Sequence, residues 1–302
     1  MNRIMKKTSA AVLSLAMLAS SAAALNQSGV QNGLTITASA AGAFTEGTYA
    51  GLTYREYSNS ITLTGCNNNI TTLTIPEKIN NKPVTHIDRG AFANKTALRT
   101  VKYNESVNYV PAYAFANCTN LTSVYLSNAV KSMEPAAFVG CKKLEKFDVP
   151  YTTTYIGQGA LAGCTALKKV IFHGNTQIAV SLFKDVDTGI ETAFTGKIYC
   201  YPGTRPAAYA LNKGYNRVFY KMGDVNFNNI IDATDASQIL GFYASLSTGG
   251  NIPAAQREKM EICADVDRDN HIDACDASAV LGYYAAISTG YTYSFEYYMA
   301  NR

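Results

Sequence analysis

Two acidic segments near the C-terminus place oxygen-bearing side chains at the spacing of a calcium-binding loop. Residues 224–235 and 265–276 each carry Asp or Asn at the first, third, fifth, ninth and twelfth positions, and the carbonyl of the seventh residue completes the set. Hard oxygen ligands at this spacing suit a hard cation, so the sequence predicts two bound calcium ions. The predicted ligands are Asp224, Asn226, Asn228, Ile230 (carbonyl), Asp232 and Asp235 in the first loop, and Asp265, Asp267, Asp269, His271 (carbonyl), Asp273 and Asp276 in the second.

Both loops depart from the common calcium-loop pattern in two ways. Asn229 and Asn270 replace the usual Gly at the sixth position, which Asn tolerates because it enters the left-handed region more readily than most residues. Asp replaces the usual final Glu. The first loop has three carboxylates and the second has five, so we expect the first site to be the weaker one. The alternative is two acidic turns without metal, in which five uncompensated Asp side chains would repel one another.

The segments that follow the loops have the apolar spacing of amphipathic helices. We expect helices from Asp235 to about Leu246, from Pro253 onward, and from Asp276 to about Ile287. The first loop follows a strand-like segment directly, so it lacks the entering helix of an EF-hand. The unit is therefore a loop followed by a helix, present twice.

This doubled unit resembles a type I dockerin, most closely the Ruminococcus type. The resemblance rests on Gly-Asp-Val-Asn at 223–226 and on the near-identical runs 232–244 and 273–285, and it covers about residues 223–291. It implies a module that folds on calcium and binds a cohesin module of a scaffoldin. Such binding would mount the chain on a cellulosome-type, polysaccharide-degrading complex.

The resemblance also implies where the cohesin would bind. The implied contacts are small or apolar, which indicates a hydrophobic recognition surface. The similarity of the two helices raises the hypothesis of two binding orientations related by a half-turn. The implied contact residues are Ala233, Thr234, Leu240, Gly241 and Ser245 in the first copy, and Ala274, Cys275, Leu281, Gly282 and Ala286 in the second.

The middle of the chain repeats every 23 residues. One repeated column is aromatic or leucine, one is entirely alanine, and one is cysteine, which we expect to be buried and unpaired despite seven cysteines in the chain. One unit cannot bury its own apolar face, so the period predicts a solenoid of stacked coils. The three columns are Phe92, Phe115, Phe138 and Leu161; Ala91, Ala114, Ala137 and Ala160; and Cys118, Cys141 and Cys164.

The repeat at 114–126 resembles the leucine-rich repeats of the BspA-like bacterial surface-protein family. The resemblance covers about residues 70–173, with capping flanks at 45–69 and 198–220. It implies adhesion or protein binding. The predicted fold is thus α+β: a short leucine-rich repeat solenoid, capped at both ends, followed by a small all-α dockerin with two calcium loop-helix (F-hand) motifs.

The N-terminus has the pattern of a secretory signal peptide, with basic residues ahead of an apolar run and then small residues. Cleavage after Ala24 or Ala40 fits equally well. We therefore expect a signal peptide and leader at 1–40, the solenoid with its caps at 41–222, and the dockerin at 223–302. No other run approaches the roughly 18 apolar residues of a membrane span. The predicted protein is extracellular, held on a cell-surface or secreted scaffoldin complex.

Composition and motifs narrow the function further. The net charge is +4, but the basic residues are scattered, which argues against nucleic-acid binding. The three histidines lie in separate units or in a calcium loop, and no hydrolase or phosphate-loop motif is present, so we expect a non-catalytic subunit. The alternatives are an enzymatic component of the complex (O-glycosyl hydrolase or peptidase) and a cell-surface or substrate adhesin.

The ligand of the solenoid is open between a protein, a glycan and a surface. Among the strand positions expected to point outward, only Tyr125 offers an aromatic face, and the chain has no Trp. A flat sugar-stacking surface is therefore weakly supported. A mixed polar face favours protein recognition, and a plain solvated sheet surface is the alternative.

Overall fold

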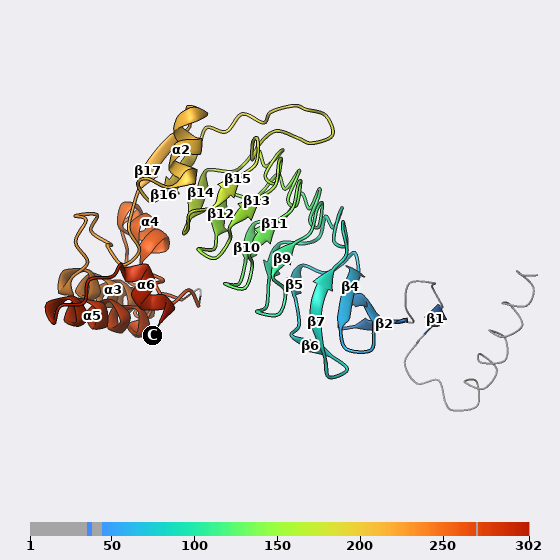
Figure 1. Ribbon diagram of the computed structural model, residues 1–302, viewed down its shortest axis with the longest axis horizontal. Coiled ribbons are helices and arrows are strands. Elements are labelled where there is room, and N and C mark those ends of the chain that lie inside the picture. Colours follow the sequence, from blue (N-terminus) through green and yellow to red (C-terminus); the bar gives the residue numbers. More distant parts are fainter. Residues whose placement is uncertain (1–34, 38–43, 270, 302) are drawn as a thin grey trace, which may run out of the picture.

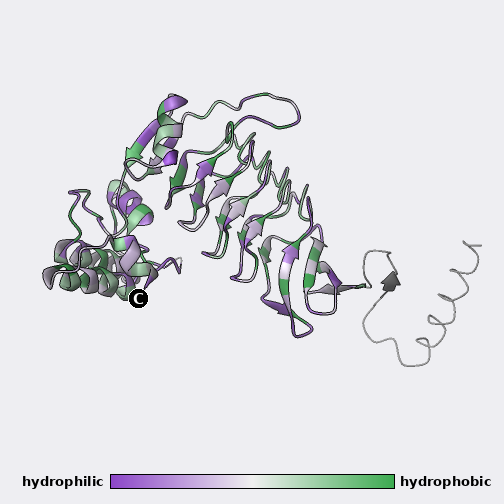
Figure 2. Cartoon of the chain, in the orientation of Figure 1, coloured by the Kyte–Doolittle hydropathy of each residue, from purple (hydrophilic) through white to green (hydrophobic). Residues whose placement is uncertain are grey.

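The computed structural model describes residues 35–37, 44–269 and 271–301 (Figure 1). The predicted signal peptide, with Ala24 and Ala40, lies outside these residues, as does Asn270. Figure 1 shows coils stacked along one axis, with antiparallel strands at the N-terminal end and helices at the C-terminal end. Along the coils, polar and apolar residues alternate (Figure 2), as expected for strands with one buried face.

An antiparallel meander covers the N-terminal end of the solenoid. Its last strand pairs in parallel with β7, which itself forms a hairpin with β6. Asn80 and Asn81 in the hairpin turn have φ values of 51° and 62°, as a tight two-residue turn requires. This hairpin adds residues to the first coil that the later coils lack. The strands are β1 (Thr35–Thr37), β2 (Phe44–Tyr49), β3 (Leu52–Glu56), β4 (Ile61–Cys66), β6 (Lys78–Ile79) and β7 (Lys82–Ile87).

The coils form three parallel sheets. In the central coils, paired residues are 23 positions apart, for example Ser123 with Thr100 and Lys146 with Lys169, whereas the spacing differs toward both ends, as in the pairing of Thr72 with Thr100. This register confirms the predicted leucine-rich repeat solenoid. The first sheet holds β5 (Thr72–Thr74), β8 (Thr100–Lys102) and β10 (Ser123–Tyr125); the second β9 (Tyr109–Val110), β11 (Ser132–Met133), β13 (Tyr155–Ile156) and β15 (Gln177–Ile178); the third β12 (Lys146–Val149), β14 (Lys169–Phe172), β16 (Lys197–Cys200) and β17 (Asn216–Phe219).

The repeated columns form ladders inside the solenoid. The rings of Phe92, Phe115 and Phe138 stack with centroid distances of 5.4 and 5.1 Å. The backbone N–H of Phe92 donates to the carbonyl of Ala114 in the next coil, at 2.9 Å, and the same bond recurs along the column. Because the backbones of neighbouring coils lie so close here, the alanine column accepts only a small side chain.

The cysteine column is buried and free, as predicted. The Sγ atoms of Cys118, Cys141 and Cys164 donate to backbone carbonyls 26 residues earlier, at 3.1, 3.3 and 3.3 Å. Each thiol therefore satisfies a carbonyl of the preceding coil as well as filling space.

The C-terminal end of the solenoid is closed by β16, the helix α2 (Arg205–Asn212) and β17, as the sequence predicted. The long connection between β15 and β16 extends back along the coils (Figure 1). There, the hydroxyl of Tyr113 donates to Oδ1 of Asp187 at 2.9 Å.

Four helices follow the solenoid: α3 (Ala233–Ser247), α4 (Ala254–Cys263), α5 (Ala274–Ser288) and α6 (Phe295–Ala300). The first three match the predicted helices, and α3 packs against α5. The helix α6 was not predicted from the sequence. The core of this region also includes solenoid side chains, among them Ile171 and Tyr199. Ile171, on β14, belongs to the core of the helical region and is fully buried.

Candidate functional site

The first acidic loop is wrapped around the carboxylate of Asp235. Its Oδ1 accepts hydrogen bonds from the N–H groups of Val225 and Asn226, at 3.0 and 3.3 Å, and its Oδ2 accepts from the N–H of Asp232 at 3.0 Å. Asp235 is fully buried. One carboxylate thus joins the start of the loop to its end.

The other side chains of this loop also turn toward its own backbone. Asp224 is 1% exposed and accepts from the N–H groups of Asn228 and Asn229, at 3.1 and 2.8 Å. The side-chain oxygen of Asn226 accepts from the N–H of Asn228, and that of Asn228 accepts from the N–H of Ile230. These bonds hold the predicted ligands within a single tight turn of chain. Asn229, at the sixth position, has a φ of 68°, as its replacement of Gly requires.

The second loop repeats this network. Asp276 accepts from the N–H groups of Val266 and Asp267 through Oδ1, at 2.7 and 3.3 Å, and from the N–H of Asp273 through Oδ2, at 2.9 Å. The side chain of Asp267 accepts from the N–H of Asp269. Because each bond matches one in the first loop, the two loops have the same local fold.

The second loop brings carboxylates close together. Ligand oxygens of Asp265, Asp267 and Asp269 all lie within 4.8 Å of one another. Burial, and then the charges of Asp276, Asp267 and Asp269, raise the pKa of Asp265 to about 7. Burial also raises the pKa of Asp276 to about 6. The cluster therefore disfavours its own negative charge and could hold a divalent cation, which would neutralise it.

The ninth residue of each loop begins the helix that follows. Asp232 accepts from the N–H of Thr234 at 2.7 Å, and Asp273 from the N–H of Cys275 at 2.6 Å. Each forms a capping box with the twelfth residue of its loop. The ring of His271 is exposed and lies near Asp269. The ring of His271 thus lies beside a predicted ligand, and the assignment of its backbone carbonyl as a calcium ligand stays a prediction.

The implied cohesin contacts lie at the surface of α3 and α5. Leu240 and Leu281 are 41% and 42% exposed, so the two copies present this position to solvent to the same extent. The smaller residues around them are exposed except for three that are half-buried. The exposed ones are Ala233, Thr234, Gly241, Ala274 and Cys275, and the half-buried ones are Ser245, Gly282 and Ala286.

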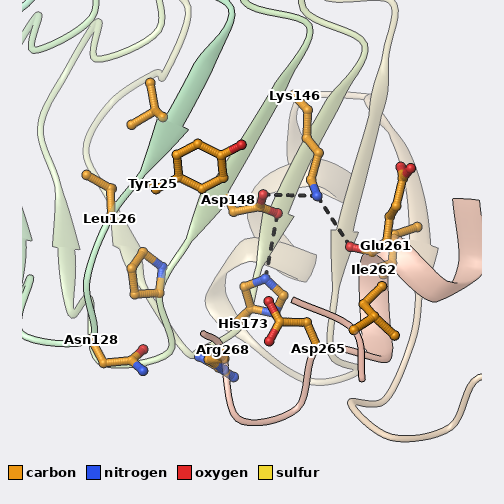
Figure 3. A pocket seen from close by; sticks show the side chains of 13 residues that line it. Tyr125, Leu126, Asn128, Lys146, Asp148, His173, Glu261, Ile262, Asp265 and Arg268 are labelled. Atoms are coloured by element: carbon orange, nitrogen blue, oxygen red, sulfur yellow. Dashed lines mark hydrogen bonds and ion pairs between the residues drawn. The ribbon is translucent and has the colours of Figure 1, made fainter. Parts of the chain in front are cut away.

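A cavity of about 190 Å³ lies between the solenoid and the second loop (Figure 3). Asp148 on β12 contacts Lys146 at 3.1 Å and His173 at 3.7 Å, and Nζ of Lys146 donates to the carbonyl of Glu261 on α4 at 3.3 Å. Burial lowers the pKa of His173 to about 4. The sequence offered no signal for this junction, because its members come from separate repeats and from a helix.

On the helical side of the same junction, Arg268 contacts the solenoid. Its guanidinium lies over the ring of Tyr151, 4.6 Å from the centroid, and lines the cavity with His173. Arg268 stands at the fourth position of the second loop, which supplies no metal ligand. The loop therefore contacts the solenoid through a residue outside the predicted ligand set.

Comparison with known proteins identifies the solenoid. Residues 60–188 match, in six copies, the family described as BspA type leucine rich repeat region. This part of the chain is similar to a BspA-type leucine-rich repeat region. No curated protein matches the chain. Among the described residues, no helix is long and apolar enough to cross a membrane.

Several solved structures are similar. The Treponema pallidum leucine-rich repeat protein TpLRR is 21% identical, with a TM-score of 0.42 over 51% of this chain and 71% of that one. A leucine-rich repeat protein from Bacteroides capillosus is 24% identical, with a TM-score of 0.40 over 43% and 99%. A leucine-rich cell surface protein from Faecalibacterium prausnitzii is 23% identical, with a TM-score of 0.37 over 43% and 40%.

Proposed function

We propose that the chain is a secreted, non-catalytic subunit that a calcium-dependent dockerin anchors to a cohesin module of a scaffoldin. In this proposal residues 41–222 form the leucine-rich repeat domain and residues 223–302 form the dockerin. The complex served would be a cellulosome-type, polysaccharide-degrading assembly outside the cell. The solenoid would bind a protein, glycan or surface for that assembly.

The observation that carries the proposal is the identical backbone network of the two acidic loops. In both, the twelfth residue, Asp235 or Asp276, binds the N–H groups of the second, third and ninth residues. A helix follows each loop directly. Two loop-helix units with these ligands, and an exposed leucine on each helix, fit a module that binds two calcium ions and one apolar partner surface.

Calcium titration of the full chain tests the metal part. We expect two binding events by calorimetry and a gain in helical circular dichroism, since a cation relieves the repulsion among the carboxylates. Magnesium at the same concentration is the control, because it demands a smaller, near-octahedral site. Absence of both heat and helix gain would contradict the proposal.

Binding to purified type I cohesin modules tests the partner. We expect binding in calcium and its loss in excess chelator. The variant Asp265→Asn, Asp276→Asn removes two carboxylates from the second loop and should weaken binding at limiting calcium. Calcium-independent binding, or none to any cohesin in a broad panel, would contradict anchoring.

The solenoid ligand is best sought at the exposed part of the first sheet. The ammonium group of Lys102 lies 5.7 Å from the ring centroid of Tyr125, which is 38% exposed. Capture from culture medium with the full chain, compared with Tyr125→Ala, tests whether this patch binds a protein. Turnover of plant polysaccharide or protein by the full chain would instead favour an enzymatic role.

A further inference from the structure

The two loop-helix units differ in what surrounds one matched pair of helix glycines. Gly241 on α3 is exposed, and no atom lies within 4 Å of the place where a Cβ would stand. Its counterpart Gly282 on α5 is half-buried, and a Cβ there would lie 2.5 Å from the hydroxyl oxygen of Tyr298. A glycine in a helix permits close approach of another surface. On α5 that approach is already made by α6.

The helix α6 is fixed in place by aromatic contacts. Phe295 is 2% exposed, and its ring lies 5.1 Å from that of Tyr283 on α5. The ring of Tyr298 lies 5.6 Å from Tyr283, and the hydroxyl of Tyr283 donates to the carbonyl of Tyr293 at 3.1 Å. Since Phe295 belongs to the core of the helical region, α6 is a built part of the fold.

The helix α6 also lies near the beginning of α5. Met299 lines a hollow together with Ala274, Cys275 and Ser278. Ala279 is fully buried, whereas Gln238, its counterpart on α3, is half-buried. Of the five implied cohesin contacts of the second copy, Gly282 is thus the one that α6 covers, while Ala274 and Cys275 border the hollow and stay exposed.

We propose that the chain binds its partner in one orientation only, through α3, because Tyr298 on α6 covers Gly282, the position on α5 that matches the open Gly241 on α3. This inference rests on the proposed function and replaces the hypothesis of two orientations. The side chains that α6 presents to α5, Tyr298 and Met299, also show the chemistry that such a face accepts. The open face of α3, with Leu240 41% exposed, accordingly fits a partner surface that presents apolar side chains.

A matched pair of substitutions tests the inference. Leu240→Asp and Leu281→Asp place the same charge at equivalent positions of equal exposure, in full-length protein with saturating calcium. Against the cohesin that binds the unchanged chain best, we expect Leu240→Asp to weaken binding about 100-fold or more and Leu281→Asp about 3-fold or less. Equal effects of the two substitutions, or no effect of either, would overturn the single orientation while leaving anchoring intact.

A rescue variant keeps the test independent of misfolding. Adding Tyr298→Ala to Leu240→Asp uncovers Gly282, so we expect it to recover cohesin binding by about 10-fold or more through α5. Helical circular dichroism in calcium checks that each variant folds. No recovery by a folded double variant would overturn the role assigned to α6. Failure of the unchanged chain to bind any cohesin would instead overturn the proposed function, and this inference with it.

Discussion

The hydroxyl of Tyr199, on the solenoid strand β16, donates a 2.6 Å hydrogen bond to Oε1 of Glu258 on α4. The same carboxylate lies 3.3 Å from the ammonium of Lys169 on β14. The helix α4 is thereby bound to two neighbouring strands of the third sheet, β14 in the repeats and β16 in the C-terminal cap. The leucine-rich repeats therefore support the helical region directly, through side chains that face outward from the sheet.

Removing the carboxylate of Glu258 should weaken the attachment of the helical region to the solenoid. We expect Glu258→Ala to lower the free energy of unfolding by about 1 kcal/mol, since Tyr199 and Lys169 both lose their partner. Urea titration measures the loss, and small-angle scattering reports any widening of the molecule. Glu261→Ala is the matched control, because only the backbone carbonyl of Glu261 bonds to the solenoid. Equal losses in both variants would contradict the assignment.

Removing the last carboxylate of each loop in turn should distinguish the calcium affinities of the two proposed sites. We expect Asp276→Asn to weaken the tighter site about tenfold and Asp235→Asn to weaken the other, because calcium affinity follows the number of charged ligands. Calorimetric titration of both variants measures this. If Asp235→Asn abolished the tighter event, the predicted order of affinities would be wrong.

Stability should fall on mild acidification because of His173. Burial lowers its pKa to about 4 in the folded chain, against an ordinary value near 6.5. Between these values the unfolded chain binds a proton that the folded chain excludes, so stability present at pH 7 is lost as the pH falls from about 6.5 to 4. The loss is on the order of 3 kcal/mol at most. Urea unfolding of His173→Gln, which lacks this titration, should show a shallower fall over that range.

Only one cysteine should react rapidly with a thiol reagent in the folded chain. Cys275 is exposed and the other six are buried, and burial raises the pKa of Cys118 to about 11. The carboxylate of Asp273 raises the pKa of the Cys275 thiol. Bound calcium would neutralise that carboxylate and lower the thiol pKa, so it should speed the reaction. Spectrophotometric thiol counting tests both points. Two or more fast thiols, or a fast thiol that survives Cys275→Ala, would contradict the buried column.

Alanine at the two helix glycines should have unequal effects. Gly241→Ala is expected to raise the free energy of unfolding by about 0.5–1 kcal/mol, since alanine favours a helix and the methyl group meets open space. Gly282→Ala should give a smaller gain or none, because its methyl group would displace the hydroxyl of Tyr298. Thermal unfolding of the pair measures the difference. Equal gains in the free energy of unfolding would show that Tyr298 on α6 does not restrict the space at Gly282.

Much of the fold could be predicted because it is periodic. The 23-residue repeat dictated which side chains enter the solenoid, and the structure places Phe115, Ala114 and Cys118 in the interior as their columns required. The loop-helix units were equally visible, since their bonds join residues at most ten positions apart. Local spacing suffices where the contacts themselves are local or repeated.

The tertiary structure alone decided how the parts meet. Tyr199 and Glu258 are 59 residues apart, and Arg268 reaches Tyr151 across 117 residues of sequence, so no local pattern announces either contact. The short helix α6 gave no sequence signal because its stability comes from packing Phe295 and Tyr298 on α5 rather than from its own six residues. The sequence by itself determined two equivalent acidic loops, each followed by a helix. Packing made them unequal, because Tyr298 on α6 covers Gly282 on α5 and leaves Gly241 on α3 open.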